Sequence, residues 1–216
     1  MLNQDDIIQL RNKYDSRISL FNQLIETTKF ILRQEIQNQQ IEIHAFDTRI
    51  KPFDSFLEKV RIKGVKEPFQ EIMDVVGLRI VCLFQSNVKN IGVIVKKNFD
   101  ILEEDDKINK VDVNIFGYMS LHYKAKLKDV QPDYKDIKDI PFEIQIRTIA
   151  QDAWASISHY LDYKNEIEIP AHLKRDFHAL SGLFYVADTH FEILRKEVTI
   201  SQSTTWVNPA QNEKGG

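Results

Sequence analysis

Apolar and polar side chains alternate along one stretch of the chain, Phe142-Glu143-Ile144-Gln145-Ile146-Arg147-Thr148. Alternation with a period of two is typical of a β-strand whose two faces meet different surroundings. We therefore expect the apolar side chains to be buried on one face, with Glu143, Gln145 and Arg147 together on the other. An acid, an amide and a cation on one face indicate a chemical surface, although the solvated face of an ordinary strand shows the same pattern.

A second stretch repeats the acid-then-arginine arrangement at the start of another apolar run, Asp74-Val75-Val76-Gly77-Leu78-Arg79. Arg79 interrupts a strand that would otherwise be wholly buried, which is unusual for a charged residue. Two carboxylates and two arginines on neighbouring strands are suited to holding a metal ion and phosphate groups. The alternative for these residues taken alone is structural, with Asp74 capping a turn and Glu143 pairing with Arg79 or Arg147.

Strand patterns and helix patterns alternate on both sides of these stretches. Helical spacing of apolar residues covers residues 5–38, as one long helix or two shorter ones, and again residues 173–194 after Pro170. Between them the expected order is strand, helix, helix, strand, helix, strand, strand, helix, at residues 41–50, 53–61, 68–73, 77–84, 87–98, 120–127, 141–148 and 150–163. This mixture predicts an α+β fold with a mixed or antiparallel sheet flanked by helices.

The same patterns divide the chain into four expected parts. They are an N-terminal helical segment (1–38), a core (39–165), a C-terminal helix (166–200) and a polar, disordered tail (201–216). The apolar stripes of the two terminal helical segments favour a homo-oligomer.

Length and composition limit what the chain does. Its 216 residues, 43% of them hydrophobic, suit one domain with appended helices, and its net charge of -3 gives no general attraction to nucleic acid or to an anionic membrane. The single cysteine, Cys82, lies in an apolar run, which favours a buried thiol and excludes an intrachain disulfide. We find neither a signal-peptide pattern nor a run of 18 or more apolar residues, so we expect a cytoplasmic protein without a membrane partner.

Several segments together resemble the synthetase region of the RelA/SpoT family. The matching residues follow the family's order over roughly residues 40–165: Arg49-Ile50-Lys51 with Ser55 and Lys59, Asp74 to Arg79, Gly117-Tyr118-Met119-Ser120-Leu121-His122, Glu143 to Thr148, and Trp154 with Tyr163-Lys164. The resemblance implies a nucleotidyltransferase-like fold. It also implies a GTP pyrophosphokinase-like enzyme, which transfers pyrophosphate from ATP to the ribose 3′-hydroxyl of GDP or GTP and so makes (p)ppGpp.

The resemblance assigns this chemistry to particular residues. Asp74 and Glu143 would hold Mg²⁺, which needs few protein carboxylates because water and phosphate oxygens fill its other positions. Glu143 is either the second metal ligand or the group that accepts the proton of the attacking hydroxyl. The implied ATP-binding residues are Arg49, Lys51, Ser55, Lys59, Arg61, Lys63 and Arg79. The implied acceptor-binding residues are Lys107, Tyr118, His122, Gln145 and Arg147, with Tyr118 stacking on the base.

Some of these residues also have a plain structural explanation. Ser55 lies four residues from both Lys51 and Lys59, so on a helix all three would face one side. A charged helix face is, however, usually only solvated. Trp154, on the last core helix, is expected to pack against the sheet, and Lys164 at its end is a weaker candidate for the site.

The chain departs from the family directly before Gly117-Tyr118, where it reads Val113-Asn114-Ile115-Phe116 and guanosine-using members usually carry a lysine and then an asparagine. The acceptor is therefore open between GDP or GTP, an adenosine nucleotide and the 3′ end of tRNA, the last two as in a toxic relative with an antitoxin partner. A catalytically silent nucleotide-binding module is a further alternative. No histidine is followed by aspartate, so we do not expect the hydrolase half of the long family members.

Overall fold

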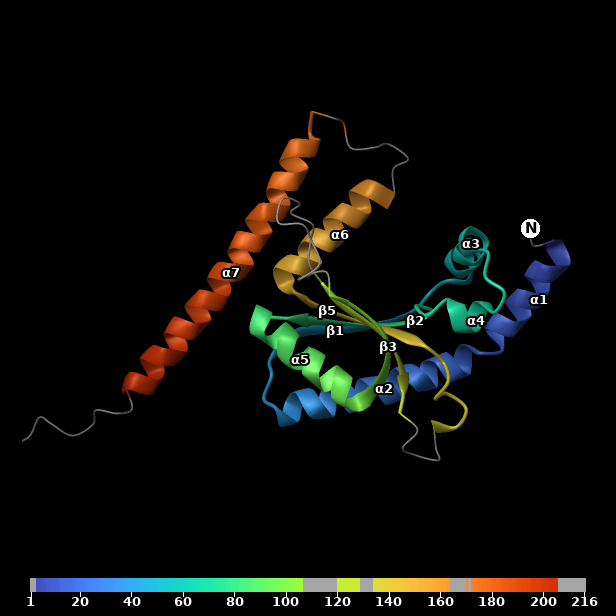
Figure 1. The fold of residues 1–216 in the computed structure, drawn as a ribbon, viewed down its shortest axis with the longest axis horizontal. Coiled ribbons are helices and arrows are strands. Elements are labelled where there is room, and N and C mark those ends of the chain that lie inside the picture. Colours follow the sequence, from blue (N-terminus) through green and yellow to red (C-terminus); the bar gives the residue numbers. More distant parts are fainter. Residues whose placement is uncertain (1–2, 107–119, 129–133, 164–169, 171, 206–216) are drawn as a thin grey trace, which may run out of the picture.

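The computed structural model of the chain describes residues 3–106, 120–128, 134–163, 170 and 172–205 (Figure 1). Within these ranges one sheet is formed by β1 Ile43–Ile50, β2 Val76–Cys82, β3 Phe99–Asp106, β4 Leu121–Leu127 and β5 Phe142–Thr148. The strand order is β1-β2-β5-β4-β3, with β2 and β5 parallel and the other neighbouring pairs antiparallel. The expected α+β fold with a mixed sheet is confirmed.

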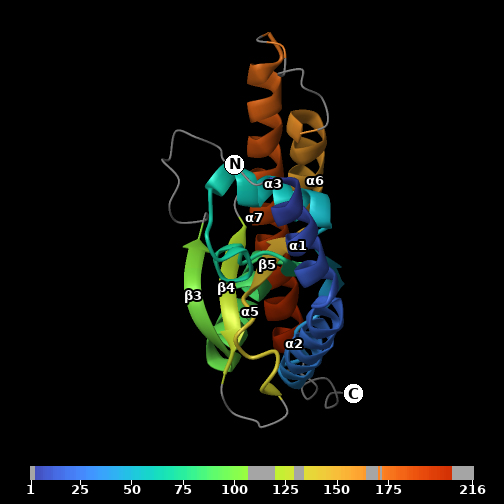
Figure 2. The same ribbon diagram turned by 90° about the vertical axis from the view of Figure 1, so that its right-hand side faces the viewer.

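The described helices lie on both sides of the sheet. They are α1 Gln4–Asp15, α2 Ile18–Asn38, α3 Phe53–Lys63, α4 Pro68–Glu71, α5 Gln85–Asn98, α6 Ile149–Tyr163 and α7 Lys174–Thr205. In Figure 1, α2 and α5 cover the lower face of the sheet, while α3 and α6 stand on its upper side. Figure 2 shows α6 and α7 extending together beyond the sheet.

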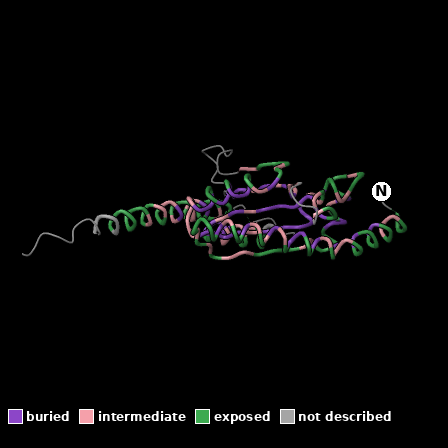
Figure 3. The backbone as a smooth tube through the Cα atoms, turned by 90° about the horizontal axis from the view of Figure 1, so that it is seen from below, coloured by how far each residue is buried: buried purple, intermediate pink, exposed green. Residues whose placement is uncertain are grey.

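The lower face of the sheet forms the hydrophobic core. Alternate residues of the central strands, among them Leu78, Ile80 and Ile144, are fully buried. Figure 3 shows the buried backbone of the strands in purple between the helices. Burying each such side chain contributes roughly 1.5–3 kcal/mol. Because successive side chains of a strand point to opposite faces, the polar residues of β2 and β5 must lie on the upper face.

Helices α6 and α7 pack against each other through aromatic rings. The ring centroid of Trp154 lies 4.5 Å from that of Phe177 and 6.1 Å from that of Phe184. The contact of Trp154 with α7 was not expected from the sequence, and the packing of Trp154 against the sheet stays a prediction. That helix also continues to Thr205, into the segment where the sequence predicts a polar tail.

Cys82 is buried, as expected, and burial raises the pKa of its thiol to about 12. A thiol in this state is not a reactive nucleophile.

Among the residues that the structure describes, no helix combines the length and the apolar character needed to cross a membrane.

Candidate active site

Two rows of polar side chains cross the upper face of the sheet, because residues paired across neighbouring strands lie side by side on one face. One row reads Arg49, Gly77, Glu143, Lys124 and Glu103. The next row reads Asp47, Arg79, Gln145, His122 and Asp105. The fold thus brings together predicted site residues from four strands.

Asp74 lies just before β2, and two lysines hold its carboxylate. Its Oδ2 atom is 2.6 Å from Lys59 Nζ and 3.0 Å from Lys51 Nζ, whereas its Oδ1 atom is buried without a hydrogen-bond partner. Burial disfavours the charged form, but the hydrogen bonds from Lys59 and Lys51 outweigh it, so the pKa of Asp74 lies below its ordinary value. Asp74 is therefore a carboxylate at neutral pH, with one oxygen still able to accept a cation.

Lys51 reaches Asp74 from the end of β1 and not from a helix. Helix α3 begins at Phe53, and Pro52 occupies its N-cap position. The α-helical conformation is disfavoured for a residue that directly precedes proline. The expectation that Lys51, Ser55 and Lys59 share one helix face is wrong for this reason.

Helix α1 stabilises the connection between β1 and α3 at Lys51. The Tyr14 hydroxyl donates a hydrogen bond to the Lys51 carbonyl, and the Lys51 amide donates to the Val75 carbonyl at 2.7 Å. The Tyr14 ring also packs against the aromatic rings of Phe21, Phe53 and Phe56. The N-terminal segment therefore fixes the backbone from which Lys51 extends.

Glu143 lies on β5, and two neighbouring side chains hold it. Gln145 Nε2 donates to Glu143 Oε2 at 2.8 Å, and His122 Nδ1 lies 3.6 Å from Oε1. On its other side the His122 ring is fixed by Ser120, whose Oγ lies 2.7 Å from Nε2. Burial raises the pKa of Glu143, but His122 and Gln145 more than offset this, so the pKa lies below its ordinary value. Glu143 is therefore ionised at neutral pH.

Glu143 lies between two pockets. The first, which we call the arginine pocket, has a volume of about 280 Å³ and is lined by Asp47, Thr48, Arg49, Gly77, Leu78, Arg79, Glu143 and Gln145. The second, which we call the carboxylate pocket, has a volume of about 210 Å³ and is lined by Lys59, Asp74, Glu103, Asp105, His122, Lys124 and Glu143. Asp74 and Glu143 thus face one cavity, as the sequence predicts.

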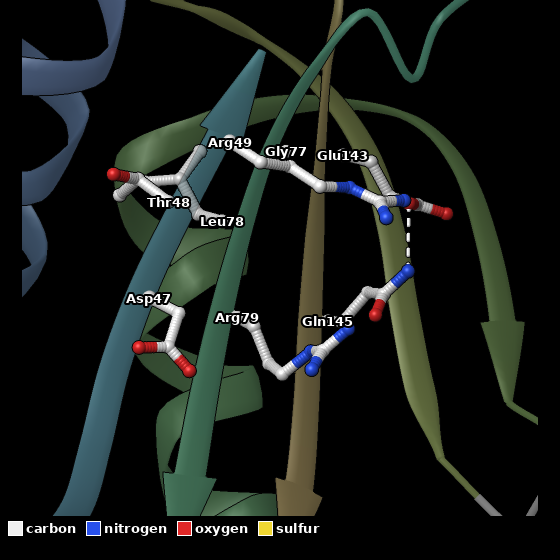
Figure 4. Close-up of a pocket in the computed structure, with 8 residues that line it drawn as sticks. All are labelled: Asp47, Thr48, Arg49, Gly77, Leu78, Arg79, Glu143 and Gln145. Atoms are coloured by element: carbon white, nitrogen blue, oxygen red, sulfur yellow. Dashed lines mark hydrogen bonds between the residues drawn. The ribbon is translucent and has the colours of Figure 1, made fainter. Parts of the chain in front are cut away.

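The arginine pocket takes its shape from two long side chains (Figure 4). Arg49 lies across Gly77 toward Glu143, and Arg79 lies toward Gln145. A Cβ atom at position 77 would be 3.4 Å from both Cγ and Nε of Arg49. Glycine therefore leaves room for Arg49 to lie flat on the sheet.

Arg79 and Arg147 pair with Asp152, a residue of α6 that the sequence did not single out. The NH1 atoms of Arg79 and Arg147 lie 3.3 Å and 3.5 Å from Asp152 Oδ1. The structural alternative that Glu143 pairs with one of these arginines is not what the structure shows. Arg147 lies outside the linings of both pockets.

Other predicted residues are not brought into the two pockets. Ser55, Arg61 and Lys63 are exposed on α3 and line neither pocket. Lys107, Tyr118 and Lys164 lie outside the described residues.

The sequence analysis also missed Lys124, which lines the carboxylate pocket and whose Nζ lies 2.6 Å from Glu103 Oε2. Its position two residues after His122 on β4 was a usable signal, since residues i and i+2 of a strand share a face.

The residues of the carboxylate pocket fit a magnesium ion whose ligands come partly from substrate. Within the described part of the chain, no three or more His, Cys, Asp or Glu side chains are grouped so as to hold a metal. Mg²⁺ often takes one or two protein carboxylates and fills its remaining positions with water and phosphate oxygens. The buried, unpartnered Oδ1 of Asp74 is suited to such a role, with Glu143 in the same pocket.

Two adjoining pockets lined by cations and carboxylates, on an α+β fold, are typical of a nucleotide-binding enzyme. Comparison with known proteins leads to the same class. Residues 48–168 match the family described as "Region found in RelA / SpoT proteins". The chain belongs to the RelA/SpoT family, and the resemblance inferred from sequence is confirmed.

Two relatives in this family match most of the chain. GTP pyrophosphokinase YwaC of Bacillus subtilis (strain 168) is 32% identical over 157 residues, which cover 70% of this chain and 73% of YwaC. GTP pyrophosphokinase YjbM of the same organism is 30% identical over 195 residues, 85% of this chain and 89% of YjbM. The crystal structure of small alarmone synthetase 1 from Bacillus subtilis superposes with a TM-score of 0.73 at 27% identity, covering 87% of this chain and 98% of that one. That synthetase has also been solved with its product pppGpp and with AMPCPP.

Proposed function

We propose that this chain transfers the pyrophosphate group of ATP to the ribose 3′-hydroxyl of GDP or GTP, with Mg²⁺ as cofactor. Two relatives named GTP pyrophosphokinase, and a related synthetase solved with pppGpp, support this reaction. The observation that carries the proposal is the position of Glu143, which lines both the arginine pocket and the carboxylate pocket. A group between two pockets is suited to a reaction that joins two bound nucleotides.

The arginine pocket is the proposed ATP site. Arg49 and Arg79 offer planar guanidinium groups, which stack on a purine ring or bind phosphate oxygens in pairs. Lys51 and Lys59 stand at Asp74, where they would neutralise the charge of the triphosphate. A role in ATP binding stays a prediction for Ser55, Arg61 and Lys63, because these exposed residues line neither pocket.

The carboxylate pocket is the proposed place of the metal and the acceptor. Asp74 would hold Mg²⁺, whose positive charge would stabilise the charge that develops on the transferred group. Glu143 would be either a second ligand of Mg²⁺ or the group that accepts the proton of the 3′-hydroxyl. In the reaction the oxygen of that hydroxyl attacks the β-phosphorus of ATP, and AMP leaves. His122 and Lys124 supply polar contacts to the acceptor, and Lys107 and Tyr118 stay predicted acceptor contacts.

A panel of acceptors tests the proposed function. The protein is incubated with Mg²⁺, ATP labelled on its β-phosphate and, separately, GDP, GTP, ADP or tRNA. We expect labelled product and AMP with GDP or GTP. AMP release with label found only in tRNA, or only in ADP that carries a 3′-pyrophosphate, would overturn the choice of acceptor. ATP binding without AMP release in any arm would indicate a silent module.

Asp74→Asn is the matching inactive variant. We expect it to lower AMP release at least about a hundredfold, because a neutral amide is a poor ligand for Mg²⁺. Asp100→Asn, at an exposed position of β3, is the control and should keep wild-type turnover. Circular dichroism checks that both variants fold. Undiminished AMP release by folded Asp74→Asn would contradict the role of Asp74.

We also propose that residues 39–165 form the synthetase core and that the outer surface of α7 joins copies of the chain. Exposed apolar side chains on α7 support this second proposal, among them Leu183, Val186, Ile193 and Ile200.

A further inference from the structure

Asp152 lies in the first turn of α6, outside the linings of both pockets. A single oxygen of its carboxylate lies 3.3 Å from NH1 of Arg79 and 3.5 Å from NH1 of Arg147. The arginines come from neighbouring parallel strands, where Arg79 is paired with Gln145 and Arg147 with Val81. One acid therefore joins two strands and one helix on the upper face of the sheet.

The start of α6 holds Asp152 firmly in place. Thr148 and Gln151 form a reciprocal cap: the Thr148 amide donates to Gln151 Oε1 at 2.9 Å, and the Gln151 amide donates to Thr148 Oγ1 at 3.1 Å. Both residues are buried. Asp152 follows immediately, at the end of the helix where the backbone dipole favours a negative charge. Its position is thus fixed by backbone as well as by side-chain contacts.

Asp152 matters to the site because of what Arg79 and Arg147 would do without it. Their guanidinium groups carry like charges, approach the same atom and are only partly exposed, at 31% and 11% of the side chain. Like charges at such separations repel, and the repulsion is strong where water is partly excluded. Arg79, which lines the arginine pocket, is the more exposed of the two, so the repulsion would displace its side chain more readily than that of Arg147.

We propose that Asp152 is a positioning residue that holds the Arg79 guanidinium in the orientation that ATP requires. This inference rests on the proposed function, because it takes the arginine pocket to be the ATP site. Asp152 itself lines neither pocket, so its effect on ATP passes through Arg79.

A double-mutant cycle on ATP affinity tests the inference. The probe is AMPCPP with Mg²⁺, whose methylene bridge prevents transfer, and its Kd is measured by calorimetry for wild type, Asp152→Ala, Arg79→Ala and the double variant. We expect Arg79→Ala and Asp152→Ala each to weaken binding, the former by about tenfold and the latter by roughly three- to tenfold. The double variant should bind no more weakly than Arg79→Ala, because the carboxylate has nothing left to position.

Two further measurements separate positioning from a loss of structure. Asp152→Glu should recover part of the affinity that Asp152→Ala loses, and the Kd for GDP should change much less than the Kd for AMPCPP. Glu35→Gln is the matched control, since it removes an ion pair of 3.1 Å with Lys97 between α2 and α5 on the lower side of the sheet. It should leave the Kd for AMPCPP unchanged.

The possible failures are distinguishable. If the losses of the two single variants multiply in the double variant, or if Arg79→Ala binds AMPCPP like wild type, the inference about Asp152 is overturned and the proposed reaction stands. If wild type binds AMPCPP but forms no AMP with any acceptor, the proposed reaction falls while the cycle still decides the role of Asp152. A wild-type chain that binds no AMPCPP overturns both.

Discussion

At the scale of single residues, the arginine pocket depends on a missing side chain. Arg49 crosses the strand β2 at Gly77, and its Cγ and Nε atoms lie 3.4 Å from where a Cβ would be. Alanine at this position needs only a shift of a few tenths of an ångström in Arg49. The two methyl groups of valine need more space and would displace the Arg49 side chain from the sheet.

We therefore expect Gly77→Val to raise the KM for ATP by about tenfold, because one charged contact is lost. The KM for the acceptor should change less. Valine suits the geometry of a strand, so the variant should still fold. Gly77→Ala is the graded control and should lie close to wild type. Equal KM values for all three proteins would show that Arg49 does not contact ATP.

At the scale of elements, a polar network attaches α7 to the start of α5 and to the end of β5. Glu192 Oε2 accepts hydrogen bonds from the amide and hydroxyl of Ser86 at the start of α5, at 3.1 Å and 3.0 Å. Arg195 donates to Ser86 Oγ at 2.6 Å and to Asn87 Oδ1 at 2.9 Å. Beside them Thr148 Oγ1 donates to Asp188 Oδ2 at 2.6 Å, so the end of β5 is tied to α7.

We expect this attachment to depend on pH because of Asp188. Its side chain is buried, and burial raises the pKa of its carboxyl above the ordinary value, although bonds from Thr148 and Gln85 act in the opposite sense. A raised pKa in the folded state means that the contribution to stability is full below the ordinary pKa and is lost as the pH rises through the folded pKa. An asparagine side chain does not titrate, so the Asp188→Asn variant does not lose stability in this way as the pH rises.

We predict that the free energy of unfolding of Asp188→Asn, measured in urea relative to wild type at a series of pH values, rises as the pH increases from the ordinary pKa of an aspartate through the raised pKa of Asp188. The total rise should be on the order of 1 kcal/mol. Asp176→Asn, at an exposed position of α7, is the control and should show no such trend. A constant difference between Asp188→Asn and wild type over this range would contradict the prediction.

Elements differ in how far the sequence alone predicts them. Strand β5 is predicted within a residue, because it has one apolar and one polar face. Strand β3 was missed, because its acidic run, residues 103–106, is polar on both faces. Glu103 faces Lys124 on the upper side, and Glu104 pairs with Lys96 of α5 at 2.7 Å on the lower side. An edge strand of this kind shows no alternation, so only its neighbours reveal it.

The candidate site shows the same division. Glu143 and Arg79 could be predicted because they lie among apolar residues within strands, where a charged residue is unusual, and Asp74 because it lies just before such a strand. Asp152 could not be assigned a partner, because its contact with two arginines depends on how α6 turns away from β5. The local signal for that turn was present, since Thr148 and Gln151 have the spacing of a capping box.

At the scale of the whole molecule, the site and the outer surface of α7 are separate. None of the described residues that line the two pockets belongs to α7, and α7 extends away from the sheet with much of its surface exposed (Figure 3). Val186, Ile193 and Ile200 recur every seven residues and are 49%, 49% and 57% exposed. A repeat of seven places them along one stripe of the helix, as in helix pairs that pack lengthwise.

We expect the wild-type protein to have a mass in solution of at least twice the 25.3 kDa of one chain. The double variant Val186→Glu/Ile193→Glu should shift to the monomer, because burying two carboxylates in an apolar contact is unfavourable. Size-exclusion chromatography with light scattering measures both masses. Val93→Glu, at a 65% exposed position of α5, is the matched control and should keep the wild-type mass.

Because no described residue of α7 lines either pocket, we further expect the monomeric variant to retain AMP release within about threefold of wild type. A wild type that is monomeric at the concentrations used would refute the contact between copies. A monomeric variant that is folded but inactive would contradict this expectation and would mean that a second copy completes the site.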